Sequence, residues 1–479
     1  MKNTRKNMML SLFAILLMSS CSWLEVSPSN EVNEKDLDLR NALNGIYLKL
    51  SNTSLYGSNL SYGFIEVLAQ RYLPERMNNT SSYYKASKFL YDDASVKSII
   101  SNIWSNAYNG VASCNHLIHL VTESTPDHFE GREMEQDMIH GEALALRAFF
   151  HFDILRMFAP SMVVDDGKKY IPYVDEYPVI TTTYYSNAEI LERIEKDLLE
   201  ARKLVATCDV EQNPRWMVTS CRMFADAVAG VLPDDVFFAY RGYRMNYYAI
   251  TALLARVYLW EKDYKQAYDM AKEVIEAAYD GRKFFGFVTD SELGSDMKDS
   301  ENIIFTASRT TLLDEYKPYT LDDSQTLFLF KKKDIFDEGS DDEQSTEDKR
   351  GGTSMFGTSS KYGEQYSRKY LLEEGETGYD MIPILRLSEM YYIAAEYHAQ
   401  INQFTEAKDL LTTVRQERGI MSTPINVESI GGFYTELIKE VRKEQLGEGQ
   451  LYFLYKRLDR KTFGTDVKFV FDRPNNEDI

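Results

Sequence analysis

The sequence has few cationic side chains for its size. Across 479 residues, 54 Lys and Arg face 74 Asp and Glu, so the formal net charge is −20. Binding to nucleic acid depends on Lys and Arg that displace the counterions of the phosphates, and adsorption to an anionic membrane depends on a basic patch. The charge balance therefore argues against a nucleic-acid-binding protein and against one held on a membrane by a basic surface.

Catalytic and metal-binding signatures are also missing. The sequence contains no G-x-S-x-G, H-E-x-x-H, G-x-x-x-x-G-K-[ST] or G-x-G-x-x-G motif, and these mark common hydrolases and nucleotide-binding proteins. His116 and His119 have the i, i+3 spacing of a metal pair, but no neighbouring cluster of Cys, His or acidic residues completes a ligand set. We therefore predict a binding protein with no catalytic residue, metal or cofactor, although sequence alone cannot single out a glycosidase-like carboxylate pair.

Only four cysteines are present, too few for a disulfide framework. One of them, Cys21, belongs to the N-terminal segment described below. Cys208 and Cys221 could close a short loop and leave Cys114 free, or all three could be unpaired thiols. We favour unpaired thiols, because three cysteines cannot pair completely.

Long hydrophobic runs are confined to the first twenty residues. Residues 8–18 (MMLSLFAILLM) form an apolar stretch behind Lys2, Arg5 and Lys6. As a helix this stretch would rise about 16 Å, half of the ~30 Å hydrocarbon core of a bilayer. It therefore predicts a cleaved signal peptide over residues 1–20 rather than a membrane span.

The next residues resemble a bacterial lipoprotein processing site. In the string LLMSSC, the small Ser19 and Ser20 precede Cys21, as they do in a lipobox. The resemblance implies that Cys21 is lipidated and becomes the first residue of the mature chain, and two or more acyl chains are enough for stable anchoring. Ser22 implies sorting to the outer membrane, and the polar residues 21–36 predict a tether between membrane and fold.

Helical periodicity dominates the rest of the chain. Segments 37–50, 100–121, 141–158 and 187–205 repeat apolar residues every three or four positions. Asn187 is the expected N-cap of the fourth helix. In segment 141–158 the charged residues lie largely off the apolar stripe: Glu142, Arg147, Asp153 and Arg156. These patterns predict a predominantly all-α fold.

Two later segments repeat one another at an offset of 140 residues. Residues 247–277 superpose on residues 387–414, and the aligned small residues are Ala255 with Ala395 and Ala267 with Ala407. Each segment is typical of helix, short turn and helix, with small residues where the helices must approach closely. Tetratricopeptide-like pairs bury their faces against neighbouring pairs in this way. We therefore predict a scaffold of such pairs; the alternative is two unrelated helix hairpins.

Irregular stretches separate the helical blocks. We divide the chain into an N-terminal region at 37–246 and a C-terminal region at 247–479, which contains a loop-rich insertion at 281–384. Loops of this length usually carry function. The acidic run 337–348 (DEGSDDEQSTED) lacks the ligand spacing of an EF-hand, so we interpret it as a solvated loop rather than a calcium site.

Six segments, in order behind the lipobox, are similar to segments of the SusD/RagB family. They are CSWLEVSPSNEV, IWSNAYNGVASCNHLI, GEALALRAFFHFDILRMFAP, PILRLSEMYYIAAEYHAQINQFTEA, VRQERG and the E-x-R-x-E-x-x-x-E-G run of 440–449. The matching residues are Trp104, Tyr108, Asn115, Glu142, Leu146, Arg147, Ala148, Arg386, Glu389, Tyr391, Glu396, Glu440, Arg442, Glu444, Glu448 and Gly449. Since the matched charges fall inside predicted helices, we interpret them as interhelical pairs that fix packing rather than as ligand contacts.

The resemblance implies an outer-membrane lipoprotein that captures nutrient, most simply an oligosaccharide, and delivers it to a SusC-like TonB-dependent transporter. Some members of the family take peptide, so peptide cargo is an alternative within the same role. A lipoprotein hydrolase on a helical scaffold is an alternative of another class. Binding without turnover would separate the hydrolase from the other two.

The family has no invariant ligand motif, so the binding-site prediction rests on residue types. Sugar rings stack their C–H faces on aromatic side chains, and their hydroxyls pair with Asn, Arg and carboxylates. Loop 70–85 and the residues around 316–319 combine these types, with Trp216 as an isolated further aromatic. We predict ligand binding by Tyr72, Arg76, Asn78, Tyr83 and Tyr84, with Tyr316 and Tyr319 opposite. The alternative is that these tyrosines pack or face the transporter.

Overall fold

A computed structural model describes residues 37–179, 182–225, 232–336, 347–421, 425–460 and 467–474 of the chain. The predicted signal peptide 1–20, the predicted lipidation site Cys21 and the predicted tether 21–36 lie outside the described residues. The same is true of most of the acidic run 337–348.

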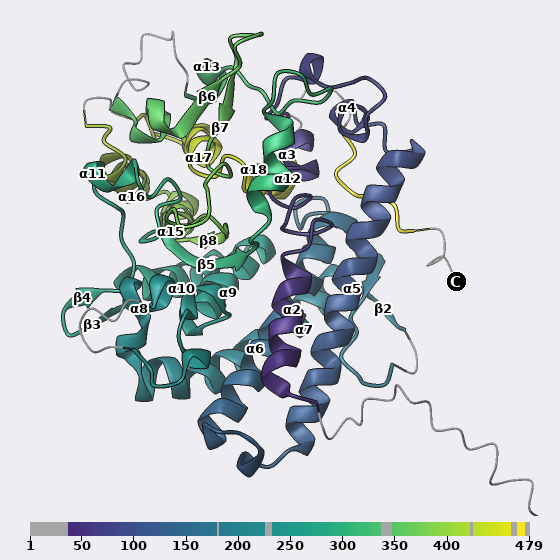
Figure 1. Ribbon diagram of the computed structural model, residues 1–479, viewed down its shortest axis with the longest axis vertical. Helices are drawn as coiled ribbons and strands as arrows, with labels where there is room; N and C mark the ends of the chain where they lie inside the picture. Colours follow the sequence, from purple (N-terminus) through teal and green to yellow (C-terminus); the bar gives the residue numbers. More distant parts are fainter. Residues whose placement is uncertain are drawn as a thin grey trace, which may run out of the picture.

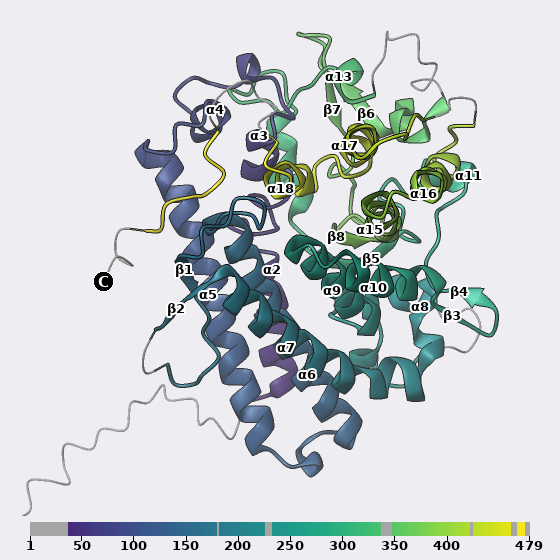
Figure 2. The same cartoon turned by 180° about the vertical axis from the view of Figure 1, so that it is seen from behind.

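The described chain consists mainly of helices packed side by side (Figure 1). Helix α2 (Leu39–Leu50) lies against α5 (Ala94–Glu123), and a continuous row then runs from α5, each helix packed against the next. The row continues through α6 (Arg132–Phe158), α7 (Asn187–Ala206), α9 (Tyr247–Glu261), α10 (Tyr264–Glu276), α15 (Leu387–Gln400), α16 (Phe404–Glu417) and α17 (Ile430–Glu444). The view from behind places α15, α16 and α17 on the side away from α2, α5 and α6 (Figure 2). The prediction of a predominantly helical fold is confirmed.

Shorter elements connect these helices. The short helices are α3 (Phe64–Leu68), α4 (Ser82–Ser87), α8 (Thr219–Phe224), α11 (Asp290–Leu293), α12 (Leu312–Tyr316), α13 (Lys332–Phe336) and α18 (Gln450–Arg457). The strands form four antiparallel pairs: β1 (Lys169–Pro172) with β2 (Tyr184–Ser186), β3 (Ala278–Tyr279) with β4 (Arg282–Lys283), β5 (Ile303–Ser308) with β8 (Met381–Arg386), and β6 (Phe356–Thr358) with β7 (Gln365–Ser367).

The two repeated segments form the helix pairs that the sequence predicts. Helices α9 and α10 make the first pair, α15 and α16 make the second, and α10 packs against α15. The four aligned alanines are fully buried: Ala255, Ala267, Ala395 and Ala407. Lys262 and Asn402, which are equivalent in the repeat, both have positive φ values of 74° and 61° in the turn between helices. The pairs therefore share a turn conformation as well as a packing pattern.

Helix α6 differs from its predicted amphipathic form. It begins at Arg132, before the predicted segment 141–158, and every residue from 141 to 158 is buried. The off-stripe charges do not face solvent, because α5, α7 and α2 all pack around this helix. Charged residues on a helix buried all round must find partners inside the protein.

Helix α7 is capped one residue earlier than predicted. The Ser186 hydroxyl accepts from the backbone N–H of Glu189, and the Glu189 carboxylate accepts from the backbone N–H of Ser186 at 2.8 Å. This is a capping box. Asn187 is instead the first helical residue, and its side-chain amide donates to the Pro160 carbonyl at 2.9 Å.

The sheet of β5 and β8 was not predicted, and it joins segments that lie far apart in the chain. Ile303 pairs with Arg386 and Ser308 with Met381. Arg386 therefore ends a strand, rather than lying inside the predicted helix. Both strands are almost wholly buried against α9, and one large hydrophobic cluster extends from α2 to the C-terminal segment around Phe471.

The described cysteines are free thiols, and His116 and His119 lie against the same tyrosine ring. Cys114, Cys208 and Cys221 are free and buried, which confirms the preferred prediction of unpaired thiols. The rings of His116 and His119 both lie against Tyr177, with centroid distances of 4.5 and 5.4 Å.

Among the described residues, no helix has the length and apolar character needed to cross a membrane.

Candidate ligand-binding site

Most of the charged residues that resemble those of the SusD/RagB family form ion pairs inside the fold. Glu142 pairs with Arg241 and Arg244, and Arg147 donates to Asp197 at 2.7 Å. The remaining pairs are Arg386 with Glu448, Glu389 with Arg256 and Glu396 with Arg457. This confirms the interpretation that these charges fix packing, and it removes them as candidates for ligand contact.

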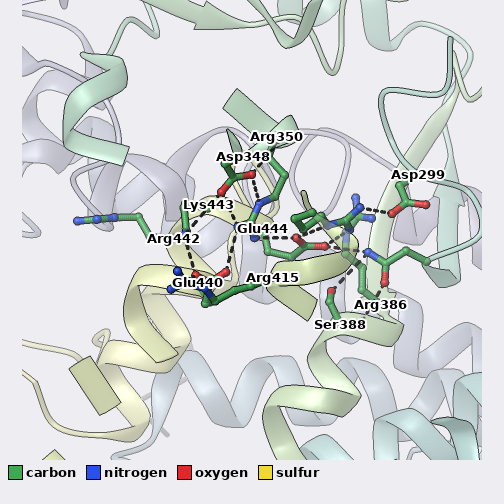
Figure 3. Close-up of polar contacts among 12 residues, drawn as sticks. Asp299, Asp348, Arg350, Arg386, Ser388, Arg415, Glu440, Arg442, Lys443 and Glu444 are labelled. Atoms are coloured by element: carbon green, nitrogen blue, oxygen red, sulfur yellow. Dashed lines mark hydrogen bonds and ion pairs between the residues drawn. The ribbon is translucent and has the colours of Figure 1, made fainter. Parts of the chain in front are cut away.

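Two glutamates of α17, Glu440 and Glu444, are held in a buried network of cations (Figure 3). Glu440 accepts from Lys443 at 2.6 Å and from Arg350 at 3.0 Å. Glu444 accepts from Arg350 at 3.0 Å and also from Arg418, whose guanidinium donates to Asp299 as well. The network thus ties α17 to α16, to the segment around Arg350 and to the segment before β5.

The cations outweigh burial in setting the ionisation of these carboxyl groups. Burial alone would raise the pKa of Glu440, but Lys443, Arg350 and Arg415 lower it to about 2. For Glu444, Arg418 and Arg350 likewise overcome burial and hold the pKa well below its ordinary range. Both carboxyl groups are therefore charged at neutral pH, and the network is structural.

A large open cavity lies elsewhere, between the segment after α2 and the segment around α12. Its volume is about 530 Å³. It is lined by Thr53, Ser54, Ser58, Asn59, Tyr62, Tyr83, Asp314, Glu315, Pro318, Tyr319, Ser324 and Thr326. Three aromatic rings, several hydroxyls, an amide and two carboxylates thus share one wall, which is the mixture of groups that a polyhydroxylated ligand needs.

A stack of aromatic rings builds this wall. Phe328 is stacked with both Tyr72 and Tyr319, with centroid distances of 4.4 and 4.2 Å and interplanar angles of 8°. Two rings stacked so closely on one phenyl group must occupy its opposite faces. Tyr83 meets Phe328 edge-on at 5.2 Å and Tyr319 at 5.8 Å. The stack therefore holds the rings of two distant loops in fixed positions.

Backbone hydrogen bonds reinforce the same junction. The Leu73 N–H donates to the Leu329 carbonyl at 2.8 Å, and the Leu327 N–H donates to the Arg76 carbonyl at 2.9 Å. On the far side, Arg309 pairs with Glu315 and donates to the Ser51 carbonyl at 3.1 Å. The loops that line the cavity are thus linked to one another.

The structure brings two of the predicted ligand-binding residues into the cavity wall, Tyr83 from loop 70–85 and Tyr319 from the opposite loop. Burial raises the pKa of both phenols. Their hydroxyls are therefore neutral at physiological pH and can both donate and accept hydrogen bonds.

The other predicted residues do not line the cavity. Tyr72 and Tyr316 are only 5% and 1% exposed, because Tyr72 lies behind Phe328 and Tyr316 packs on Tyr62 at 4.9 Å. These two rings support the wall from behind. Arg76 pairs with Glu364 at 2.6 Å, Asn78 donates to Gln325 at 2.7 Å, and Tyr84 lies 5.6 Å from the Lys88 ammonium. Trp216 is buried against Phe238.

Sequence reasoning missed the wall contributed by residues 53–62. Ser58, Asn59 and Tyr62 lie in a stretch rich in Ser, Asn, Gly and Tyr, NTSLYGSNLSYG at 52–63. Its composition is the same kind that pointed to loop 70–85. That signal could have identified the segment, although nothing in the sequence indicates which loops face each other.

The fold is thus a scaffold of helix pairs with an open cavity lined by loops. The family model described as starch-binding associating with outer membrane matches residues 22–259, and the SusD family model matches residues 296–476. The chain therefore belongs to the SusD/RagB family. Comparison with curated proteins finds no match.

Solved structures agree with this assignment. A SusD superfamily protein from Bacteroides thetaiotaomicron has a TM-score of 0.65 and 22% identity, and the match covers 89% of each chain. A putative sugar binding protein from Bacteroides vulgatus has a TM-score of 0.62 and 22% identity, covering 87% of this chain and 86% of that one. A SusD-like carbohydrate binding protein from the same species has a TM-score of 0.61 and 18% identity, covering 88% and 83%. At these identities the likeness shows the fold.

We predict that Glu440→Gln lowers the free energy of unfolding at pH 7 by about 3–5 kcal/mol, because it leaves Lys443 and Arg350 buried without a full counter-charge. Urea denaturation would measure this loss. The control is Asp269→Asn, which breaks an exposed i, i+4 pair with Lys265 and should cost about 1 kcal/mol or less. A loss of similar size in both variants would contradict the structural role of the network.

The lowered pKa of Glu440 predicts that the folded protein loses stability in acid. The pKa of the Glu440 carboxyl group is 4.5 in the unfolded chain, but it is about 2 in the folded protein. Its contribution to stability is therefore complete above about pH 4.5 and is lost as the pH falls toward 2. The wild-type free energy of unfolding should fall more steeply over this range than that of Glu440→Gln.

Proposed function

We propose that this protein captures oligosaccharide in the cavity lined by Tyr83 and Tyr319 and does not cleave it. The observation that carries the proposal is the shared wall of fixed tyrosine rings, hydroxyls and carboxylates in an open cavity of about 530 Å³. A cavity of this size accommodates a few sugar rings or a short peptide, within the range of ordinary ligand sites.

The chemistry of the wall favours sugar over a purely apolar ligand. Tyr83 and Tyr319 offer ring surface for the C–H face of a pyranose. The Asp314 carboxylate is exposed, and the Asn59 amide and the Ser58 hydroxyl lie in the same wall. These groups can accept from or donate to the hydroxyls at the ring edge. Two similar structures described as sugar or carbohydrate binding proteins support the same class of ligand.

We infer the place of the protein in the cell from the family and from the N-terminal sequence. A family description that places its members at the outer membrane supports an outer-membrane location. The lipobox around Cys21 would supply the anchor, with the chain facing outward on its tether. The partner that this role requires is a SusC-like TonB-dependent transporter, to which the captured ligand would pass.

We predict that Tyr319→Ala weakens binding of the cognate oligosaccharide by about 0.5–1.5 kcal/mol or more, because it removes a stacking surface. Tyr319→Phe keeps the ring and should retain most of the affinity. An array of glycans and peptides would first identify the ligand, and calorimetry would then measure each variant.

The matched control is Tyr279→Ala, which removes a tyrosine that is 45% exposed and does not line the cavity. Its affinity should equal that of the wild type. Unchanged affinity in a folded Tyr83→Ala, Tyr319→Ala double variant would place the site elsewhere. If the protein bound peptides selectively, its cargo would be peptide and not oligosaccharide. If it hydrolysed the ligand, it would be an enzyme.

We predict that Cys21→Ala abolishes acylation and releases the protein from membranes, because the thiol is the expected attachment point and two acyl chains are needed for stable anchoring. Labelling with a fatty-acid analogue and membrane fractionation would measure both effects. Cys114→Ala is the control, since Cys114 is a buried thiol of the fold. Unchanged acylation and membrane retention in Cys21→Ala would exclude Cys21 as the lipid anchor.

We also predict that the wild-type protein co-purifies with a β-barrel transporter after extraction in mild detergent. Lasting complexes of this kind usually bury more than about 2,000 Å², enough to survive gentle solubilisation. Mass spectrometry of the tagged protein's eluate would identify the partner. Recovery of the free protein alone, while the transporter is expressed in the same cells, would argue against a stable complex.

A further inference from the structure

A second, smaller cavity lies inside the helical core and shares no lining residue with the first. Its volume is about 70 Å³, and its walls come from α6, α9, α15, α17 and α18. A single water needs roughly 10–15 Å³ of such space. The cavity therefore has room for a small solute but not for an oligosaccharide. Most of its wall is apolar: Leu259, Ile393, Leu437, Val441, Phe453 and Leu454.

Three N–H groups of the lining residues are buried without a hydrogen-bond partner among the described residues. They are Nε of Arg156, Nη1 of Arg256 and Nε1 of Trp260, and the Tyr392 hydroxyl is a fourth polar atom of this kind. Arg156, Arg256 and Trp260 are 2%, 5% and 2% exposed. Buried donors without an acceptor are rare in folded proteins, and several in one cavity indicate a bound acceptor.

The remaining nitrogen atoms of the two arginines are already engaged. Arg256 donates Nε and Nη2 to the Glu389 carboxylate at 2.7 and 2.6 Å. Arg156 donates to Gln450 at 3.1 Å and to Asp153, and its guanidinium lies 3.9 Å from the centroid of the Phe453 ring. Because these contacts fix both guanidinium groups, the free N–H groups cannot turn toward other acceptors.

We propose that this cavity binds a small monovalent anion, the size of a halide or formate, that accepts hydrogen bonds from Arg156, Arg256 and Trp260. Arg457 adds a third arginine to the lining. Each of the three arginines also pairs with a carboxylate, Arg156 with Asp153, Arg256 with Glu389 and Arg457 with Glu396, so the proposal rests on the N–H groups that have no partner among the described residues. An anion can accept from all three N–H groups without bringing a donor that needs an acceptor of its own, and hydrogen bonds to a charged acceptor are the stronger kind.

Such an ion would link α6 to α9 and fill the space between them and the C-terminal helices. Its ligands come from α6 and α9, and the opposite wall of the cavity belongs to α15, α17 and α18. An anion bound only by the folded protein stabilises it by mass action. The expected consequence is a melting temperature that rises with the concentration of a small anion, independently of any sugar at the first cavity.

Bromide is the probe for this test. The melting temperature is measured against sodium bromide concentration, with ionic strength held constant by the sodium salt of a bulky sulfonate. The wild type should gain stability with bromide. Trp260→Phe keeps the ring system largely in place but removes one donor, and its apparent affinity for bromide should be about tenfold weaker, as expected for one lost hydrogen bond to a charged group.

The matched control is Trp216→Phe. The Trp216 indole N–H is also buried and has no hydrogen-bond partner among the described residues, but Trp216 does not line this cavity. Its bromide response should equal that of the wild type. Equal responses in Trp260→Phe and Trp216→Phe would overturn the proposal.

Crystals grown in bromide provide a readout that does not depend on variants. We expect an anomalous peak in the cavity within hydrogen-bonding distance of Arg156, Arg256 and Trp260. Ordered water at these positions without an anomalous signal would show that the cavity is a hydration site and not an anion site.

Discussion

Glu440, Glu444 and Glu448 lie close together at the end of α17, and each is buried among arginines and lysines that come from distant parts of the chain. Arg350, Arg418 and Arg386 belong to three different segments, and all of them meet these carboxylates. Loss of the cationic partners of a buried carboxylate strongly destabilises the fold, because it leaves a buried charge uncompensated. The C-terminal helices can therefore pack in this way only if β8, α16 and the segment around Arg350 are all in place.

The same reasoning applies around α6. Glu142, Arg147 and Arg156 are buried, and each is paired with a residue of another segment. Charge pairing in this protein sets which helices are neighbours, while the apolar residues fill the space between them. The rigid scaffold that results supports the cavity, where Phe328 separates Tyr72 from Tyr319 and holds the wall in shape.

The sequence predicts those parts of the fold that depend on local pattern. The pairs α9–α10 and α15–α16 could be placed because helical period and small residues repeat at a fixed offset. The β5–β8 sheet could not, because its strands are more than seventy residues apart and each is a short buried run without alternation. The partners of the charged residues on helix α6 could not be predicted for a related reason: nothing in the sequence indicates which residues of other segments they meet.

The candidate site was predictable in composition but not in detail. Loops rich in Tyr, Asn and Ser contribute to the cavity, and Tyr83 and Tyr319 meet in one wall. Tyr72 and Tyr83 cannot be told apart in the sequence, yet only one of them lies behind Phe328. That difference arises from a contact between residues more than two hundred positions apart. Residue type can therefore indicate a binding loop, whereas the ligand-facing side chains depend on tertiary packing.

The most direct test of this account is a crystal structure of the protein with the oligosaccharide that an array identifies. The account predicts an intact oligosaccharide in the cavity of about 530 Å³, with a sugar ring against Tyr83 or Tyr319 and hydroxyls within hydrogen-bonding distance of Asn59 or Asp314. An oligosaccharide bound at another surface, or one cleaved in the crystal, would contradict it.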